Sequence, residues 1–143
     1  MTHIQVAVAE IGKQEIPKGS NWGTDVKKYL NSVGINFPAS WCMAFVYYCC
    51  KTANPLTKLP KSGGVLAVWN KADKSIKFTK PVAGDVFIMD FGKGLGHTGF
   101  VESVNGEFIN TIEGNTNDEG SREGYEVCRR ARKISACKGF IRV

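Results

Sequence analysis

The longest apolar run in the sequence, from Trp41 to Cys50, places the strongest constraint on the fold. It is shorter than the ~20 apolar residues that a membrane-spanning helix needs. Since its apolar side chains would cover nearly every face of a helix, other elements must surround it. Asn54-Pro55 follows the run, and the residue before a proline disfavours helical geometry. The pattern therefore predicts a buried central helix from about Cys42 to Thr52.

Weaker helical patterns lie on both sides of this segment. Residues 3–12 predict a short helix that ends at Gly12. A second helix is expected to begin at a cap formed by Asn21 or Thr24 and to run to about Val33. A further helix is expected over residues 65–71.

The pattern changes after Pro81, where short apolar stretches replace helical spacing. Asn105-Gly106 is a strong signal for a hairpin between two of these stretches. Helices followed by antiparallel strands predict a single α+β domain over residues 1–143, with the N-terminal helices packed on one face of an antiparallel β-sheet. The expected strands are residues 86–89, 97–104, 108–113, 125–131 and 138–143, and the last two are expected to form a pair.

Composition and charge narrow the classes of partner. The chain is 43% hydrophobic and 22% charged, which is typical of a globular domain and not of a disordered one. The net charge of +6 favours anionic partners such as nucleic acid, acidic wall polymers or membrane surfaces. The basic run Arg129–Lys133 is better explained as a solvated surface, because it lacks the interleaved aromatic residues of a nucleic-acid site. We therefore expect no nucleic-acid partner.

The cysteines argue against a metal site. There are five, so at least one thiol is unpaired, and no Cys-x-x-Cys pair occurs. We therefore expect no structural zinc site and no cofactor. A disulfide between Cys128 and Cys137 stays open, since the sequence does not define its geometry.

Cys42 stands where the predicted central helix begins. A helix N-terminus stabilises a thiolate, and its unpaired first-turn N–H groups can donate to an oxyanion. On its own, Cys42 is better explained as a small core residue, as Cys49 and Cys50 are. A nucleophilic role therefore needs a partner elsewhere in the chain.

His97 is the candidate partner. It follows a glycine-rich loop, residues 92–96, and opens a predicted strand, from which an imidazole can project over a cleft as a general base. Such a base needs a third group to orient its ring, and Glu113 or Asn115 on the adjacent strand could supply it. Taken singly, His97, Glu113 and Asn115 are each explained equally well as an ordinary residue at a strand end or in a turn.

The hairpin register decides whether these residues can meet. A two-residue Asn105-Gly106 turn would pair Val104 with Glu107 and turn Glu113 to the opposite face from His97. A three-residue loop would pair Ser103 with Glu107, so that His97, Glu113 and Asn115 share one face. A catalytic role therefore predicts a bulged or odd-length hairpin.

Several segments together resemble the CHAP domains, the cysteine, histidine-dependent amidohydrolases and peptidases. The resemblance extends over nearly the whole chain, and its specificity comes from the order and spacing of the motifs. The segments are residues 15–23, Pro38–Val46, Ala83–Phe87, Gly96–Val101, Glu113–Asn115 and Gly139–Arg142.

The resemblance implies a papain-like fold and hydrolysis of amide bonds in peptidoglycan, by a protein of bacterial or phage origin. By position, Cys42 matches the nucleophile, His97 the general base, Glu113 the third residue and Asn115 the polar residue that assists it. Asp85 matches a structural position. No carboxylate occupies residues 36–40, where some phage members carry a calcium loop, so we expect no metal. We also expect Trp41, Asn21 and Trp22 to bind substrate.

Other functions remain open. The scissile bond lies either between sugar and peptide, as for an amidase, or within the peptide stem, as for an endopeptidase. Rival classes are an NlpC-type wall endopeptidase, although Ser40-Trp41-Cys42 departs from its Asp-Cys-Ser context, and a non-catalytic wall-binding module of the same fold.

We expect a monomer that acts in the cell wall, secreted or periplasmic, with an immunity or inhibitor protein as partner if it is an antibacterial effector. Residues 1–5 lack the features of a signal peptide. Export by another route, a removed signal and an internal location are therefore all alternatives.

Overall fold

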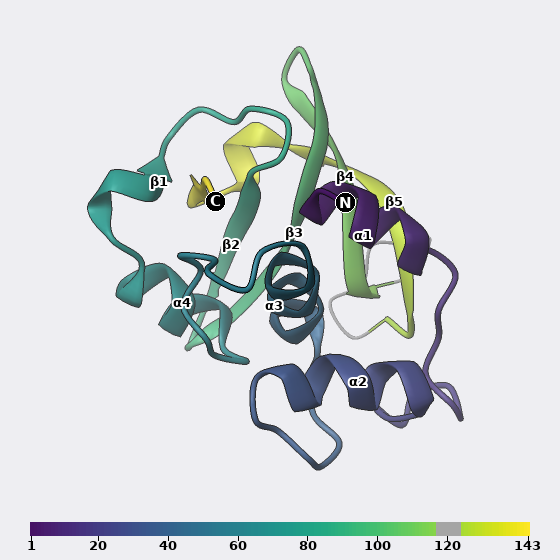
Figure 1. Cartoon of the computed structure of the whole chain (residues 1–143). Helices are drawn as coiled ribbons and strands as arrows, with labels where there is room; N and C mark the ends of the chain where they lie inside the picture. Colours follow the sequence, from purple (N-terminus) through teal and green to yellow (C-terminus); the bar gives the residue numbers. More distant parts are fainter. Residues whose placement is uncertain (117–123) are drawn as a thin grey trace.

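A computed structural model describes residues 1–116 and 124–143, and it shows an antiparallel sheet with α-helices on one side (Figure 1). The α+β class predicted from the sequence is confirmed. No helix of the described residues is long and apolar enough to span a membrane. The helices are α1 (His3–Glu10), α2 (Thr24–Ser32), α3 (Cys42–Ala53) and α4 (Val65–Lys71), with short 3₁₀ helices η1 (Lys74–Ile76) and η2 (Ile134–Ala136).

The sheet has the strand order β1-β6-β2-β3-β4-β5, and each pairing is antiparallel. The expected pairing of the last two strands is wrong, because β5 pairs with β4 whereas β6 lies between β1 and β2. Phe140 and Ile141 of β6 are both buried and point to opposite faces, so this strand needs an interior position. The strands are β1 (Lys77–Phe78), β2 (Val86–Gly92), β3 (Leu95–Asn105), β4 (Phe108–Thr116), β5 (Glu126–Lys133) and β6 (Gly139–Ile141).

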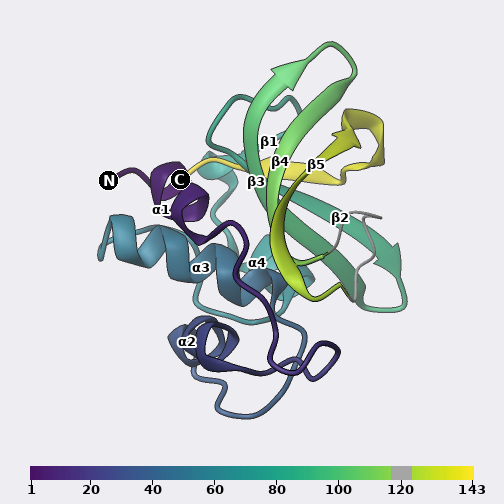
Figure 2. The ribbon, with the colours of Figure 1, turned by 90° about the vertical axis from the view of Figure 1, so that its right-hand side faces the viewer.

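Helix α3 is the buried central helix that the apolar run predicted. Figure 2 shows one end of α3 reaching the strands, with α1 above the helix and α2 below it. Trp41, Met43, Ala44, Phe45 and Val46 have no exposed surface. At α2 the predicted cap is wrong: Gly23 is the N-cap and no side chain caps the helix, while Asn21 has a left-handed φ of 55°.

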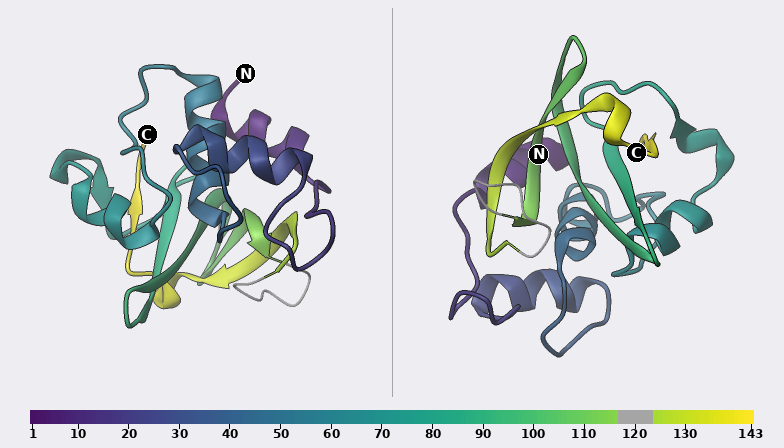
Figure 3. Two further views of the ribbon diagram at one scale, coloured as in Figure 1. Left: turned by 90° about the horizontal axis from the view of Figure 1, so that it is seen from below. Right: turned by 180° about the vertical axis from the view of Figure 1, so that it is seen from behind.

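The two faces of the sheet carry separate apolar clusters. Val86, Ile88, Phe100 and Ile112 pack with the helices. The opposite face carries a smaller cluster of Phe87, Met89, Val101, Ile109 and Phe140, against which Ile134 of η2 packs. Seen from behind, the strands and η2 lie nearer the viewer than α3 (Figure 3, right).

The β3–β4 hairpin is bulged, as the catalytic hypothesis required, but its register differs from both alternatives considered. Asn105 pairs with Phe108, which leaves Gly106 and Glu107 as the turn, and the bulge lies between Val101 and Ser103. Beyond the bulge Phe100 pairs with Ile112, so continuing the register places Gly99 opposite Glu113. The turn and the bulge together shift the pairing by two residues from one in which His97 would lie directly opposite Glu113. Because a shift of two residues keeps side chains on the same face, His97 and Glu113 share a face and are diagonal neighbours.

Candidate active site

Cys42 is the first residue of α3. The N-cap is Trp41, whose side chain makes no capping hydrogen bond, and the first turn holds no acidic residue. The first helical hydrogen bond runs from the Phe45 N–H to the Trp41 carbonyl. No capping side chain therefore competes for the first-turn N–H groups, which point in the direction needed to stabilise an anion.

His97 lies on β3 with no exposed surface, and one of its ring nitrogens is held by Glu113 of β4. The distance from His97 Nε2 to Glu113 Oε1 is 2.8 Å. Because an ionised carboxylate can only accept, this bond places a proton on Nε2 and leaves Nδ1 as the second site of the ring.

The second ring nitrogen is available to Cys42. His97 Nδ1 is buried and has no well-aligned hydrogen bond to any described residue, while the Cys42 side chain is close enough to interact with the ring. Burial would lower the pKa of His97, but the interactions with Cys42 and Glu113 outweigh it and raise this pKa to about 9. Catalytic hydrogen bonds are often poorly aligned before substrate binds. The imidazole is thus a strong acceptor for a thiol proton.

Glu113 is also fully buried, and it is held as a carboxylate by several donors. Burial would raise the pKa of Glu113, but hydrogen bonds from Arg132 and His97 lower it to about 2. Thr111 Oγ1 donates to Glu113 Oε2 over 2.6 Å. Gly99 leaves room for the side chain, since a Cβ there would lie 2.8 Å from Glu113 Cγ.

Asn115 is not placed to orient His97 as expected. Its Oδ1 accepts from the Trp41 N–H over 2.8 Å and its Nδ2 donates to the Gly124 carbonyl over 2.6 Å. The reason is a break in strand alternation: Asn115 has a φ of 58°, and the β4–β5 register shifts between Glu113 and Thr116. Asn115 therefore holds the backbone beside the nucleophile instead of the imidazole.

The expected substrate contact by Trp41 is also wrong. Trp41 has no exposed surface, stacks on Tyr29 and donates from its indole Nε1 to Glu15 Oε2 over 2.7 Å. Glu15 is itself buried and was not singled out from the sequence, where it reads as an ordinary loop carboxylate. The two residues anchor the loop before α3 to the N-terminal segment.

The other two expected substrate contacts are half-buried. Trp22 packs against the core beside the helices, and Asn21 precedes it in the same loop. Asp85 is fully buried and accepts from Arg142 Nε over 2.8 Å, in keeping with a structural position. None of the five cysteines, all of which are described residues, forms a disulfide, so Cys128 and Cys137 are not bonded to each other. Among the described residues, no group of three or more His, Cys, Asp or Glu is arranged to hold a metal ion.

Arg132 is a site residue that sequence reasoning missed. The run 129–133 was interpreted as a solvated surface, but only part of it is. Arg129 is exposed, whereas the Arg132 side chain retains 14% of its exposed area and pairs with Glu113. Alternation along β5 was the signal that could have separated them, since arginines at odd spacing cannot all face water in a strand.

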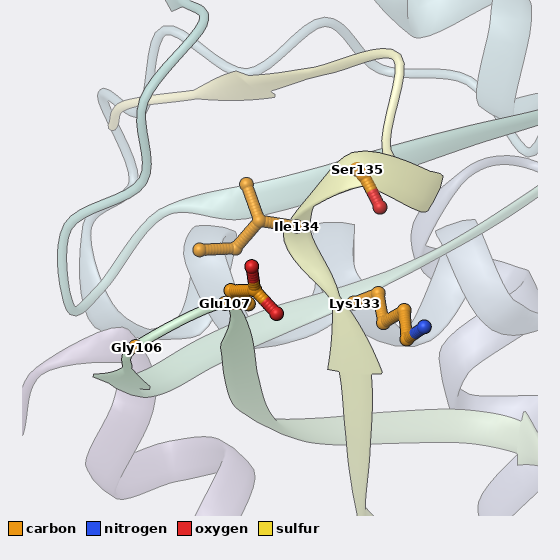
Figure 4. Close-up of a pocket in the computed structure, with 5 residues that line it drawn as sticks. All are labelled: Gly106, Glu107, Lys133, Ile134 and Ser135. Atoms are coloured by element: carbon orange, nitrogen blue, oxygen red, sulfur yellow. The ribbon is translucent and has the colours of Figure 1, made fainter.

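A pocket of about 550 Å³ lies outside this site. Gly106 and Glu107 of the hairpin turn and Lys133, Ile134 and Ser135 line it (Figure 4). Neither Cys42 nor His97 belongs to its walls. Because Cys42 and His97 are 3% and 0% exposed, the candidate active site is narrow. The open pocket is therefore not the candidate active site.

The His97–Glu113 pair predicts a pH window for stability. Since the pKa of Glu113 falls from 4.5 to about 2, its contribution is present above pH 4.5 and is lost as the pH falls through 2. Since the pKa of His97 rises from 6.5 to about 9, its contribution is present below pH 6.5 and is lost as the pH rises through 9. Thermal unfolding from pH 2 to 10 should show these two losses, and Glu113→Gln should flatten both. An unchanged profile in that variant would contradict the assignment.

Gly114 predicts a packing requirement beside the nucleophile. A Cβ at Gly114 would lie 2.7 Å from the Trp41 ring and 2.9 Å from Phe45. We expect Gly114→Ala to lower the free energy of unfolding by about 1–3 kcal/mol, the usual cost of overpacking. Gly64→Ala is the matched control, because its nearest neighbour is at 3.4 Å, and denaturant titration measures both. Equal stability of the two variants would show that this contact is not tight.

One of three comparisons with known proteins finds a match. A family model described as "CHAP domain" matches residues 33–115, which is more than half of the chain and includes Cys42, His97, Glu113 and Asn115. No curated protein and no solved structure matches the chain significantly. The chain thus belongs to the CHAP domain family, whose members are generally cysteine- and histidine-dependent amidohydrolases and peptidases that act on peptidoglycan.

Proposed function

We propose that this protein hydrolyses amide bonds of peptidoglycan, with Cys42 as nucleophile, His97 as general base and Glu113 as the residue that orients His97. One observation carries the proposal: the buried imidazole is bound at Nε2 by Glu113 while its Nδ1 is left for the Cys42 side chain. This order of nucleophile, base and orienting group is the arrangement that activates a thiol.

The chemistry proceeds through a thioester. Nδ1 of His97 takes the proton of Cys42, and the sulfur attacks the amide carbonyl. The Cys42 N–H, at the uncapped start of α3, donates to the oxyanion. The C–N bond then breaks as His97 returns the proton to the leaving amine. Water, deprotonated by His97, attacks the thioester and releases the acid, which restores the thiol.

The family and the net charge support the proposed substrate and the proposed location. Wall polymers are anionic, and the net charge of +6 favours binding to them. We therefore propose a site of action at the cell wall, reached by secretion or release into the periplasm. Asn115 and Glu15 support the loop that ends at Cys42, which is a positioning role.

A digest of purified peptidoglycan tests this function. Mass spectrometry of the soluble fragments should show new amine and carboxylate ends, and their position separates an amidase from a stem endopeptidase. Wild-type protein that releases no fragments from walls of several chemotypes would contradict the proposal.

Selective alkylation provides an independent prediction. Cys137 is more exposed than Cys42, but burial raises the pKa of Cys137 to about 11. At pH 6 we expect iodoacetamide to modify Cys42 faster than Cys137, because His97 lies beside Cys42 and can hold its proton. Peptide mapping measures the two rates in one sample. Faster labelling of Cys137 would mean that exposure and not activation governs reactivity.

A further inference from the structure

Four hydrogen bonds converge on the Glu113 carboxylate, and three of them come from residues other than His97. Arg132 donates from Nε to Oε2 over 2.8 Å and from Nη2 to Oε1. Thr111 Oγ1 donates to Oε2 and His97 Nε2 to Oε1. Each carboxylate oxygen therefore accepts two bonds, and its orientation is set by the Arg132 fork and Thr111.

We propose that Arg132 is a positioning residue that, together with Thr111, fixes the Glu113 carboxylate against His97. The inference rests on the proposed function, since it names a residue on which the same site depends. Arg132 does not touch the reacting atoms; it acts through Glu113 on the ring that faces Cys42.

The fork supplies both geometry and charge. A guanidinium binds a carboxylate through two parallel N–H donors, which fixes its plane as well as its position. Burial opposes the charge of Glu113, and the hydrogen bond from Arg132 is the largest effect that lowers the pKa of this carboxyl. Without Arg132, the carboxylate would lose that counter-charge in a site with no exposed surface.

The other titratable groups around Glu113 come from three segments. His97 faces it from β3, Cys128 is its cross-strand neighbour on β5, and Cys137 interacts electrostatically with it from beyond η2. Cys42 interacts with the far side of the imidazole from α3. Arg132 is the cationic side chain that hydrogen-bonds to Glu113 in this group, so among the described residues that bond to the carboxylate its removal leaves the His97 ring to balance the charge.

A second arginine fork on the same strand supplies the matched control. Arg129 donates from Nε and Nη2 to Glu102 over 2.8 and 2.9 Å, which is the same bidentate geometry at an exposed place. The Arg129 side chain retains 54% of its exposed area. Loss of this fork should be nearly neutral, since exposed ion pairs contribute little.

The test compares Arg132→Gln, Arg132→Lys and Arg129→Gln in the full chain. In Arg132→Gln, we expect the pKa of Glu113, followed by NMR of the ¹³C-labelled carboxyl, to rise from about 2 towards or above its ordinary 4.5. Iodoacetamide labelling of Cys42 should slow, and kcat on peptidoglycan should fall by about 10- to 100-fold at similar KM. Arg132→Lys should keep the carboxyl pKa low yet still label Cys42 slowly, because an ammonium cannot form the fork.

Wild-type values of the Glu113 pKa and of the labelling rate in Arg132→Gln would overturn the proposal. A wild-type rate of Cys42 labelling in Arg132→Lys would contradict the proposal that the bidentate fork positions Glu113. If Arg132→Gln does not fold, Arg132→Lys provides the test. Arg129→Gln should match the wild type in all readouts, and an equal loss there would also contradict the proposal. Neither the NMR nor the labelling needs turnover, so a wild-type protein inactive on peptidoglycan would refute the proposed function alone.

Discussion

Replacing Cys42 with alanine should reduce release of peptidoglycan fragments by at least about 1,000-fold, the scale seen when an enzyme loses its nucleophile. Without the sulfur no thioester can form, and the buried site offers no other thiol next to His97 among the described residues. The fold should persist, because the change removes a single atom at the start of α3. Wall binding should therefore survive, and a pull-down with insoluble peptidoglycan can measure it separately from turnover.

Cys50→Ala is the matched control for this experiment. Cys50 lies on the same helix and is 2% exposed, close to the 3% of Cys42, but burial raises the pKa of its thiol to about 12. The Cys50→Ala variant should be slightly less stable, because the substitution leaves a small cavity, and it should keep its activity. Wild-type activity in Cys42→Ala, or an equal loss of activity in Cys50→Ala, would remove Cys42 from the mechanism.

Loss of His97 should be almost as severe, and more severe than loss of the Glu113 charge. His97→Ala removes the group that takes the thiol proton and returns it to the amine, so we expect kcat to fall by about 1,000-fold or more. Glu113→Gln keeps an oxygen that can accept from Nε2, and a loss of about 10- to 100-fold is expected. The order of these two losses is the informative result.

A titration of His97 connects the kinetics with the structure. The sequence contains two histidines, His3 and His97, so ring NMR signals can be assigned with His3→Gln. In Glu113→Gln the pKa of His97 should fall from about 9 towards 6.5, and the alkaline limb of activity should move in the same direction. A Glu113→Gln variant that is less active than His97→Ala, or that leaves the His97 titration unchanged, would exclude the proposed order of roles.

The positions of Cys42 at a helix start and of His97 on a strand could be predicted from sequence, because each lies in a strong local pattern. The apolar run after Pro38 places Cys42 at a helix start, and His97 opens a strand after a glycine-rich loop. A shared face for His97 and Glu113 required a bulged hairpin, and the parity of the pleat made that requirement testable. The position of the bulge, next to Glu102 and not in the turn, could not be predicted, since several strand registers place His97 and Glu113 on the same face.

The contacts of Asn115 and Arg132 could not be predicted from such local patterns. Asn115 departs from strand alternation because its backbone is left-handed, and this brings its amide to the Trp41 N–H. Arg132 looks like its neighbours in a basic run, and only the pairing of β5 with β4 brings it to Glu113. The wrongly predicted pairing of the last two strands also reflects long-range packing. After β5 at one edge of the sheet, the chain continues through η2 to β6, which lies between β1 and β2.

Local hydrophobic patterns were thus sufficient for the α+β class, the buried central helix and the placement of Cys42 at its start, because these depend on periodicity over a few residues. The strand order, the anchoring of Glu113 by Arg132 and the attachment of Asn115 to Trp41 depended on contacts between residues 19 to 74 positions apart. Packing of the whole chain selects such contacts, because each one is formed only when burial and hydrogen bonding are satisfied at both ends together.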